Sequence, residues 1–532
     1  MRRGFMPHPR MLAAIAAMTL VMSGCTSFSE YVHNGFKVGP NYAPPPGPVA
    51  GHWIESSKHP LLDQSDDLSR WWCVFHDPTL NQLIAHSYRQ NLTVRAAGDR
   101  IKQAQAQLGV ARGGLFPQSQ DITGGYTRSQ ASSAPSGGVG FPLVSSSWNV
   151  SANLAWQLDF WGEFRRAIEA AGANLDYQVA SYDQAVITLL AAVASDYVRI
   201  RTDQRRIVVL EENVKLEEQI LRVVRNRYNN GRASELDLDQ AATTLESVTA
   251  QIPPVRQDME QTNAQLCVLL GIPPDDLVRC LGEAPIPTAP PEVAIGIPCQ
   301  LLTRRPDIRQ AERLAAEQSA EIGIAIAAAY PMVSISGNFG WESDRLGSLF
   351  TPQAFQGNVG PSFQWNILNY GRILNNDRAQ QAAFNALVAT YQNTVLQAQA
   401  DVETGLAAFL ESQEQTKELQ LSVTDAQKAV KVAMNQYEAG RTDMTTVATV
   451  ALILVQQEVL LTQAQGAIAL GLIQTYLGLG GGWELRCQPQ DNSPLGPIVA
   501  PPKPAAASPE NDIVPKEVVP APPAADDSAN AK

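Results

Sequence analysis

The sequence predicts a mainly α-helical protein in which four short alternating segments add a membrane β-barrel contribution. Three observations predict this fold class: one unit occurs twice, each copy holds a very long heptad-repeat helix, and each copy holds two strand-like segments. We therefore expect a duplicated unit of helix, strand, strand, long helix and returning helix within the 532 residues.

The N-terminus predicts export from the cytoplasm. Arg2, Arg3 and Arg10 precede an apolar run over residues 11–22, which ends at Ser23-Gly24-Cys25. A basic region, a short apolar core and small residues at a cleavage point are typical of a signal peptide, here residues 1–24. The cysteine after Ser-Gly resembles a bacterial lipobox, so we expect Cys25 to carry the lipid; the alternative is a plain signal with an incidental cysteine. Residues 25–78 are then a lipidated, extended, Pro-rich segment.

The duplication appears when the chain is shifted by 209 residues, an offset that becomes 214 upstream of the strands. Upstream, Phe116-Pro117 falls on Tyr330-Pro331. The predicted domains are repeats at 79–271 and 299–488, a Pro-rich linker at 272–298 and a disordered Pro/Ala-rich tail at 489–532. At the 209-residue offset, Val179, Tyr182, Val186, Val193, Leu210, Val214 and Tyr228 fall on Val388, Tyr391, Val395, Val402, Leu419, Val423 and Tyr437.

Each repeat is expected to begin with a helix, at about 80–113 and 300–329, and to continue after two strands into a long helix. The first long helix, 164–229, would extend roughly 100 Å at ~1.5 Å per residue. The returning helices end near Gly271 and Gly478. Apolar residues recur every seventh position from Val179 to Tyr228, which indicates coiled-coil packing.

Alternation of apolar and polar residues predicts strands at 148–158, 333–341 and 359–367, with a weaker one at 118–128. A one-faced sheet packed on a soluble core would alternate in the same way. After the signal, no uninterrupted apolar run is long enough to predict a membrane-spanning helix. The expected apolar face of the strands carries the aromatics Trp148, Trp156, Phe339, Trp341, Phe363 and Trp365.

A sheet that spans a membrane must close, because lipid offers no hydrogen-bond partner to a free strand edge. Four strands cannot close a membrane barrel, for which about eight is the minimum. The barrel must therefore contain several chains; three copies give twelve strands and four give sixteen.

The sequence resembles the TolC-like outer-membrane efflux family, in particular its NodT-type lipoprotein branch, over residues 38–483. The resemblance implies a trimer in which a twelve-stranded β-barrel continues into a long α-helical barrel. It also implies a periplasmic adaptor (membrane fusion) protein and an inner-membrane pump of the RND class as partners, with the chain in the outer membrane. Its marks are Val38-Gly39-Pro40-Asn41-Tyr42, Trp71-Trp72, Asp77-Pro78, Asn91-Leu92, Arg305-Pro306-Asp307-Ile308 and two Tyr-x-x-Gly turns.

The two turns are the candidate periplasmic gate. Their Arg and Tyr side chains could hold the tip shut or meet the adaptor, or the tyrosines could simply end the heptad seam. Thr446 and Thr449 stand where some family members carry acidic rings, which leaves only Asp443 nearby. The gate residues are Tyr228, Gly231, Arg232 and Asp237 at the first turn, and Tyr437, Gly440, Arg441 and Asp443 at the second.

The sequence contains few of the residue patterns that indicate catalysis or metal binding. All six histidines lie at or before His86, and no nucleophile-elbow, zinc-protease or phosphate-loop motif occurs, so we expect no catalytic residue, metal or cofactor. The net charge of −12 argues against nucleic acid as a partner. Cys280 and Cys299, which flank the linker, could form a disulfide in the periplasm. The alternatives to a drug-efflux channel are a periplasmic coiled-coil lipoprotein and the outer-membrane duct of a metal-efflux or type I secretion system.

Overall fold

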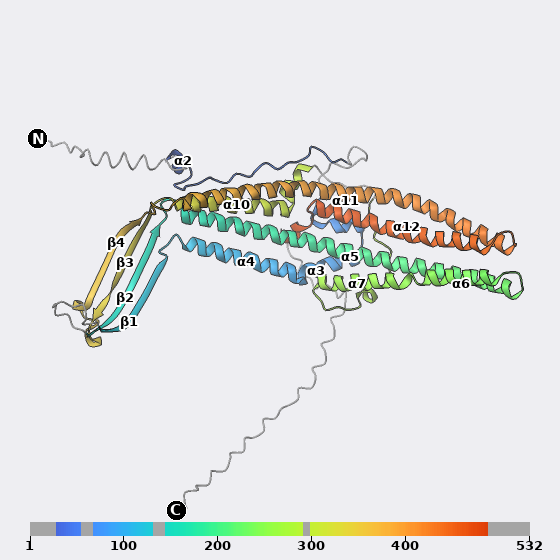
Figure 1. The fold of residues 1–532 in the computed structure, drawn as a ribbon, viewed down its shortest axis with the longest axis horizontal. Helices are drawn as coiled ribbons and strands as arrows, with labels where there is room; N and C mark the ends of the chain where they lie inside the picture. The colour runs from blue at the N-terminus through green and yellow to red at the C-terminus, as the bar shows by residue number, and fades with distance from the viewer. Residues whose placement is uncertain (1–27, 55–66, 131–143, 291–297, 488–532) are drawn as a thin grey trace, which may run out of the picture.

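The computed structural model describes residues 28–54, 67–130, 144–290 and 298–487. They form a long rod of roughly aligned helices with a four-stranded sheet at one end and two helical turns at the other (Figure 1). The signal peptide, Cys25 and the 489–532 tail lie outside the described residues. Before the first repeat come the short helix α2 (Phe28–His33) and the 3-10 helix η2 (Leu68–Phe75).

The two repeats contain corresponding elements in the same order, except that the returning helix is divided in the first and continuous in the second. The first comprises α3 (Pro78–Gln90), α4 (Leu92–Gly113), β1 (Ser119–Gln130), β2 (Val144–Leu158), α5 (Glu163–Asn229), α6 (Glu235–Thr249) and α7 (Ile252–Leu270). The second comprises α9 (Leu301–Arg304), α10 (Pro306–Ala327), β3 (Met332–Ser343), β4 (Phe355–Gln364), α11 (Arg372–Glu438) and α12 (Met444–Gly478). Between and after them lie α8 (Leu277–Leu281) and the 3-10 helices η3 (Pro298–Gln300), η4 (Leu346–Ser348), η5 (Pro352–Ala354) and η6 (Trp483–Cys487).

The first helix of each repeat is broken, which corrects the prediction of continuous helices at 80–113 and 300–329. The breaks occur at Asn91 and Arg305, which the 214-residue offset relates, and both residues have extended backbone. Asn91 accepts a bond from the Val94 amide and so caps α4. Arg305 precedes Pro306, whose ring excludes the helical conformation from the residue before it.

The returning helices differ between the repeats. Pro253 and Pro254 stand in the first turn of α7, so the chain breaks between α6 and α7. The counterpart of Pro253 is Thr462, and α12 continues unbroken through it. In contrast to the sequence expectation, α12 is long and apolar enough to cross a membrane by length and composition. It packs along α11 and against α5 and α6, as a helix of the rod.

The first helices and long helices form one row in the order α4, α5, α10, α11 (Figure 1). The main apolar core lies where this row meets α3, α7 and α12, and Val186, Val193 and Ile200 of the predicted heptad are fully buried in it. Two further apolar clusters continue towards the turns. The heptad prediction is confirmed over this central part of α5.

The N-terminal segment runs across the outside of this row. Tyr42 donates a hydrogen bond to the Glu312 carbonyl of α10 at 3.2 Å. Further along, the Ala50 and Ile54 amides donate to Gln399 and Glu403 of α11, both at 2.7 Å. A lipid on Cys25 would therefore be connected to the middle of the rod by a chain held on two helices.

The four strands form one antiparallel sheet in the order β1-β2-β3-β4. Direct partners such as Val150 and Trp341, or Val333 and Phe363, point to the same face, so the apolar positions of all four strands coincide. The strand predicted at 359–367 is β4, which begins earlier, at Phe355, and ends at Gln364, which pairs with Met332. Pro331 precedes Met332 and has no amide hydrogen with which to extend the ladder.

Candidate channel elements at the strand face and the helical tip

The polar face of the sheet carries a row of amides and one carboxylate. Asp121, Asn153, Asn338 and Asn358 are direct cross-strand partners. The Asn153 amide donates to the Asp121 carboxylate at 2.8 Å, and the Asn338 amide donates to the Asn153 side-chain oxygen. A face lined by hydrogen-bonded amides, opposite an apolar face, is the arrangement expected for strands with lipid on one side and water on the other.

Five of the six predicted strand aromatics lie within strands on the shared apolar face, and the sixth, Trp365, lies one residue past the end of β4. Trp365 nevertheless has the same role as its counterpart Trp156. The Trp156 indole donates to the Leu115 carbonyl at 3.1 Å, and the Trp365 indole donates to the Ala329 carbonyl at 3.0 Å. Both repeats thus fix the sheet to the end of the preceding helix by one tryptophan.

The two turns at the opposite end share one backbone design. Gly231 and Gly440 have φ of 67° and 70°, a left-handed conformation in which a side chain would be strained. At the first turn the Gly231 amide donates to the Tyr228 carbonyl and the Arg232 amide to the Arg227 carbonyl. The same two bonds recur at Gly440 and its successor. The predicted turns are therefore Schellman motifs that end both long helices.

The acidic residues of the turns cap the returning helices. Asp237 and Ser234 form a reciprocal capping box at the start of α6. Asp443 accepts bonds from both the amide and the hydroxyl of Thr446 at 2.8 Å, which caps α12. The backbone hydrogen bond from Thr446 holds the pKa of the Asp443 carboxyl below its ordinary value. Asp443 therefore stays ionised with its charge directed at the helix start.

The two tyrosines of the turns are not equivalent. Tyr228 is 40% exposed, whereas Tyr437 is 3% exposed. Tyr437 is buried in the apolar cluster where α11 meets the start of α12, and Arg227, which the sequence reasoning missed, lies over its ring. The Arg227 guanidinium lies 4.8 Å from the centre of the Tyr437 ring and donates to the Glu438 carbonyl at 2.6 Å. Arg227 thus joins the end of α5 to the end of α11.

Arg232 and Arg441, the predicted gate arginines, are exposed. Within the described chain their side chains make no recorded hydrogen bond or ion pair; only their backbone amides take part in the turns. Their proposed role at the gate stays a prediction, since it requires partners from another chain.

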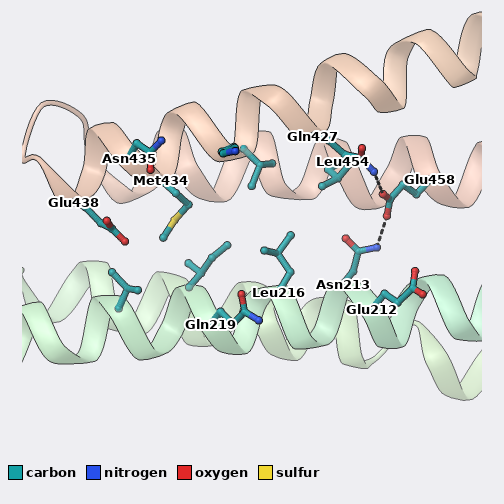
Figure 2. Close-up of a pocket in the computed structure, with 14 residues that line it drawn as sticks. Glu212, Asn213, Leu216, Gln219, Gln427, Met434, Asn435, Glu438, Leu454 and Glu458 are labelled. Atoms are coloured by element: carbon teal, nitrogen blue, oxygen red, sulfur yellow. Dashed lines mark hydrogen bonds between the residues drawn. The ribbon is translucent and has the colours of Figure 1, made fainter.

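A groove of about 470 Å³ lies between α5 and the α11–α12 pair just behind the turns (Figure 2). Glu458 of α12 accepts hydrogen bonds from Asn213 of α5 at 2.6 Å and from Gln427 of α11 at 3.0 Å (Figure 2). With the Arg227 contact, this carboxylate makes a second polar link between the two helical hairpins of one chain.

Cys280 and Cys299 are free and exposed, so the predicted disulfide is not formed. Cys280 belongs to α8, which packs on α7 of the first repeat. Cys299 belongs to η3, which packs beside α9 of the second repeat. Among the described residues, no group of three or more His, Cys, Asp or Glu side chains is arranged to hold a metal ion.

A duplicated rod of paired helices that ends in an alternating sheet defines a subunit of an outer-membrane channel. The sequence profile described as "Outer membrane efflux protein" matches residues 83–272 and 297–480. The chain belongs to this family.

Two relatives and one solved structure support membership of this family. Nodulation protein T of Rhizobium leguminosarum bv. viciae is 29% identical over 448 residues, 83% of this chain and 87% of that protein. The probable efflux pump outer membrane protein TtgC of Pseudomonas putida is 29% identical over 484 residues, 89% of this chain and 96% of that protein. The structure of the outer-membrane channel OprN matches with a TM-score of 0.77 and 28% identity, covering 84% of this chain and 99% of that one.

The predicted family, fold class, function and location are confirmed: the chain is an efflux channel subunit of the outer membrane with a periplasmic helical extension, and it is not an enzyme.

Proposed function

We propose that three copies of this chain form a passive duct that carries small molecules from a periplasmic adaptor and an inner-membrane RND-type pump to the exterior. The observation that carries this proposal is the open, four-stranded sheet with one apolar face. Its edge strands, β1 and β4, must find partners on other copies before the sheet can cross lipid. A trimer gives twelve strands, which exceeds the minimum for closure. The pump supplies the energy.

Small organic molecules are the proposed cargo. Relatives of comparable similarity are named for the export of toluene in Pseudomonas putida and of pyoverdine in Pseudomonas aeruginosa. An amide-lined strand face hydrogen-bonds water and polar solutes alike and favours no single cargo. The alternatives, metal-ion export and type I polypeptide export, are distinguished from it by testing which pump genes restore export together with this subunit.

The first test is the mass of the purified protein in detergent together with its conductance in planar bilayers. We expect a trimer that conducts weakly while its tip is closed. A monomer without conductance, purified from membranes that retain other outer-membrane trimers, would contradict the duct and favour a coiled-coil scaffold.

The lipid anchor predicts a specific covalent change. Mass spectrometry of the mature protein should find Cys25 as the acylated first residue, and Cys25→Ser should remove the acyl mass and the cleavage after Gly24. Each buried methylene of an acyl chain contributes about 0.8 kcal/mol to membrane binding, so the anchor strengthens the attachment to the membrane that the barrel already provides. Cys73→Ser, which changes an exposed cysteine, should leave the acyl mass in place. An unmodified Cys25 in the mature wild-type protein would rule the anchor out.

A further inference from the structure

The charged residues of the four strands are divided between the two faces of the sheet by sign. Asp121 of β1 and Glu342 of β3 belong to the polar face, with the row of amides. Arg128 of β1 belongs to the apolar face, because it alternates in step with Tyr126, whose ring packs 4.5 Å from that of Trp148. Arg128 is the one charged residue that the four strands place on the apolar face.

Two levels of aromatic rings mark the height of the lipid layer on β2. Trp148 and Trp156 lie about 26 Å apart along this strand, at ~3.3 Å per residue. A strand tilt of about 40° reduces this separation to about 20 Å along the membrane normal. This height is comparable to the ~25 Å apolar band of an outer-membrane barrel, which aromatic residues flank. Since the helices extend into the periplasm from the Trp156 end, Trp148 marks the boundary in the outer leaflet (Figure 1).

Arg128 lies just beyond this outer boundary. Tyr126 pairs directly with Trp148, and Arg128 pairs with Ser146, the next position on the same face towards the loops. The hydroxyl oxygens of Tyr126 and Ser146 are 3.3 Å apart. A guanidinium and two hydroxyls therefore lie together where the strands leave the apolar layer.

A second arginine stands at the same height. Ser343 of β3 is level with Tyr126, because both pair with the same tryptophan of β2. Arg345 follows Ser343 by the step that separates Arg128 from this level. The Arg345 side chain is 85% exposed, and its Nε lies 3.8 Å from the Asp344 carboxylate. Such an exposed pair contributes little, so Arg345 adds positive charge beside Arg128, which has no recorded ion pair in the described chain.

A phosphate group is the partner that this arrangement fits. A cation on the lipid face of a barrel is unfavourable at the midplane and tolerated near the interfaces, where a long side chain reaches polar lipid groups. A guanidinium binds phosphate through two parallel hydrogen bonds, and hydroxyls are further donors. The two carboxylates of the strands, Asp121 and Glu342, would repel phosphate, but both belong to the opposite face.

We propose that Arg128 and Arg345, with the neighbouring hydroxyls, bind the phosphate of a lipid in the outer leaflet. The proposal rests on the proposed duct, in which the apolar face of the sheet meets lipid. The occupant is a lipid rather than free phosphate, because the cations continue an apolar face. The rings of Tyr126 and Trp148 directly below them offer the acyl chains a surface.

The test compares the lipid that the full-length protein and its Arg128 variants retain. Each protein is reconstituted in phosphatidylcholine vesicles that contain lipid A, a bisphosphorylated glycolipid. It is then extracted in mild detergent, and the lipid A bound to each trimer is counted by native mass spectrometry. We expect Arg128→Gln to bind lipid A about tenfold more weakly than the wild type, since a charged, hydrogen-bonded contact is lost. Arg128→Lys keeps the charge without the paired hydrogen bonds and should fall between the two.

Arg225→Gln is the matched control, because it removes the same charge from an exposed arginine near the opposite end of the molecule. It should retain lipid A as the wild type does. Equal retention by Arg128→Gln and Arg225→Gln, in trimers that conduct, would overturn the inference and leave the duct standing. Displacement of lipid A by inorganic phosphate would overturn the lipid as the occupant. A monomeric wild type without conductance would overturn the duct and this inference together.

Discussion

Replacing Arg227 by Ala is expected to open the periplasmic tip and to raise single-channel conductance. The Arg227 guanidinium holds α5 to α11 through the Tyr437 ring and the Glu438 carbonyl. A cation–π contact with this buried ring and one charged hydrogen bond together contribute about 2 kcal/mol. Losing that amount shifts the closed-to-open equilibrium of one protomer by about 30-fold, since 1.4 kcal/mol is a factor of ten.

The control is Arg225→Ala, which removes the same charge two residues earlier. Arg225 is exposed, and the described chain gives its side chain no recorded partner, so its conductance should equal that of the wild type. Equal conductance for Arg227→Ala and Arg225→Ala would mean that the contact does not restrain the tip. Arg232→Ala and Arg441→Ala, measured beside them, report on contacts that only a second chain or the adaptor can supply.

The long helices could be predicted because periodicity is a local signal repeated many times. Apolar residues occur at every seventh position from Val179 to Tyr228, and the helix predicted over 164–229 is α5, Glu163–Asn229. The breaks at Asn91 and Arg305 were missed, since each depends on one cap or one proline set within otherwise helical sequence. A periodic apolar pattern continues to predict one helix when a single residue in it disfavours helix. The backbone nevertheless leaves the helical conformation at that residue.

At the tip, the glycines could be predicted and the arginine could not. Gly231 and Gly440 predict a turn by residue type alone, because glycine readily adopts the positive φ that both have. Arg227 acts on Tyr437, a partner on the other hairpin, and no local pattern joins two positions so far apart. The duplication contained one usable signal. The counterpart of Arg227 is Gln436, so the residues just before Tyr228 and Tyr437 differ, and this difference indicates different surroundings for the two tyrosines.

The second large effect concerns Glu217, a buried acid on α5. Its side chain is 1% exposed, and neither carboxylate oxygen has a hydrogen-bond partner in the described chain. Lys215 and Glu218 beside it on α5 are exposed, as is Glu246 on α6, and the Glu458 carboxylate of α12 is bonded to Asn213 and Gln427. Burial alone therefore raises the pKa of Glu217 to about 7 from its ordinary value of 4.5.

The sign of the pH effect follows from that shift. Below pH 4.5 the carboxyl is protonated in both the folded and the unfolded chain, and its stabilising contribution is fully present. Between 4.5 and about 7 only the unfolded chain ionises, so the free energy of unfolding falls by about 3 kcal/mol per protomer, at ~1.4 kcal/mol per pH unit. Glu217→Gln removes this loss, so its melting temperature should rise above that of the wild type progressively from pH 5 to about pH 7 and keep a constant lead above that.

Glu218→Gln is the matched control, because Glu218 is half-exposed and lies 3.9 Å from Arg222. Its melting temperature should follow that of the wild type at every pH, since an exposed pair contributes little. Parallel curves for Glu217→Gln and the wild type would show that Glu217 gains a partner when the copies assemble. A difference in melting temperature that widens with pH would show that each copy folds around a buried acid whose ionisation destabilises the fold above pH 5. This acid lies on α5, the helix whose end Arg227 joins to the second hairpin.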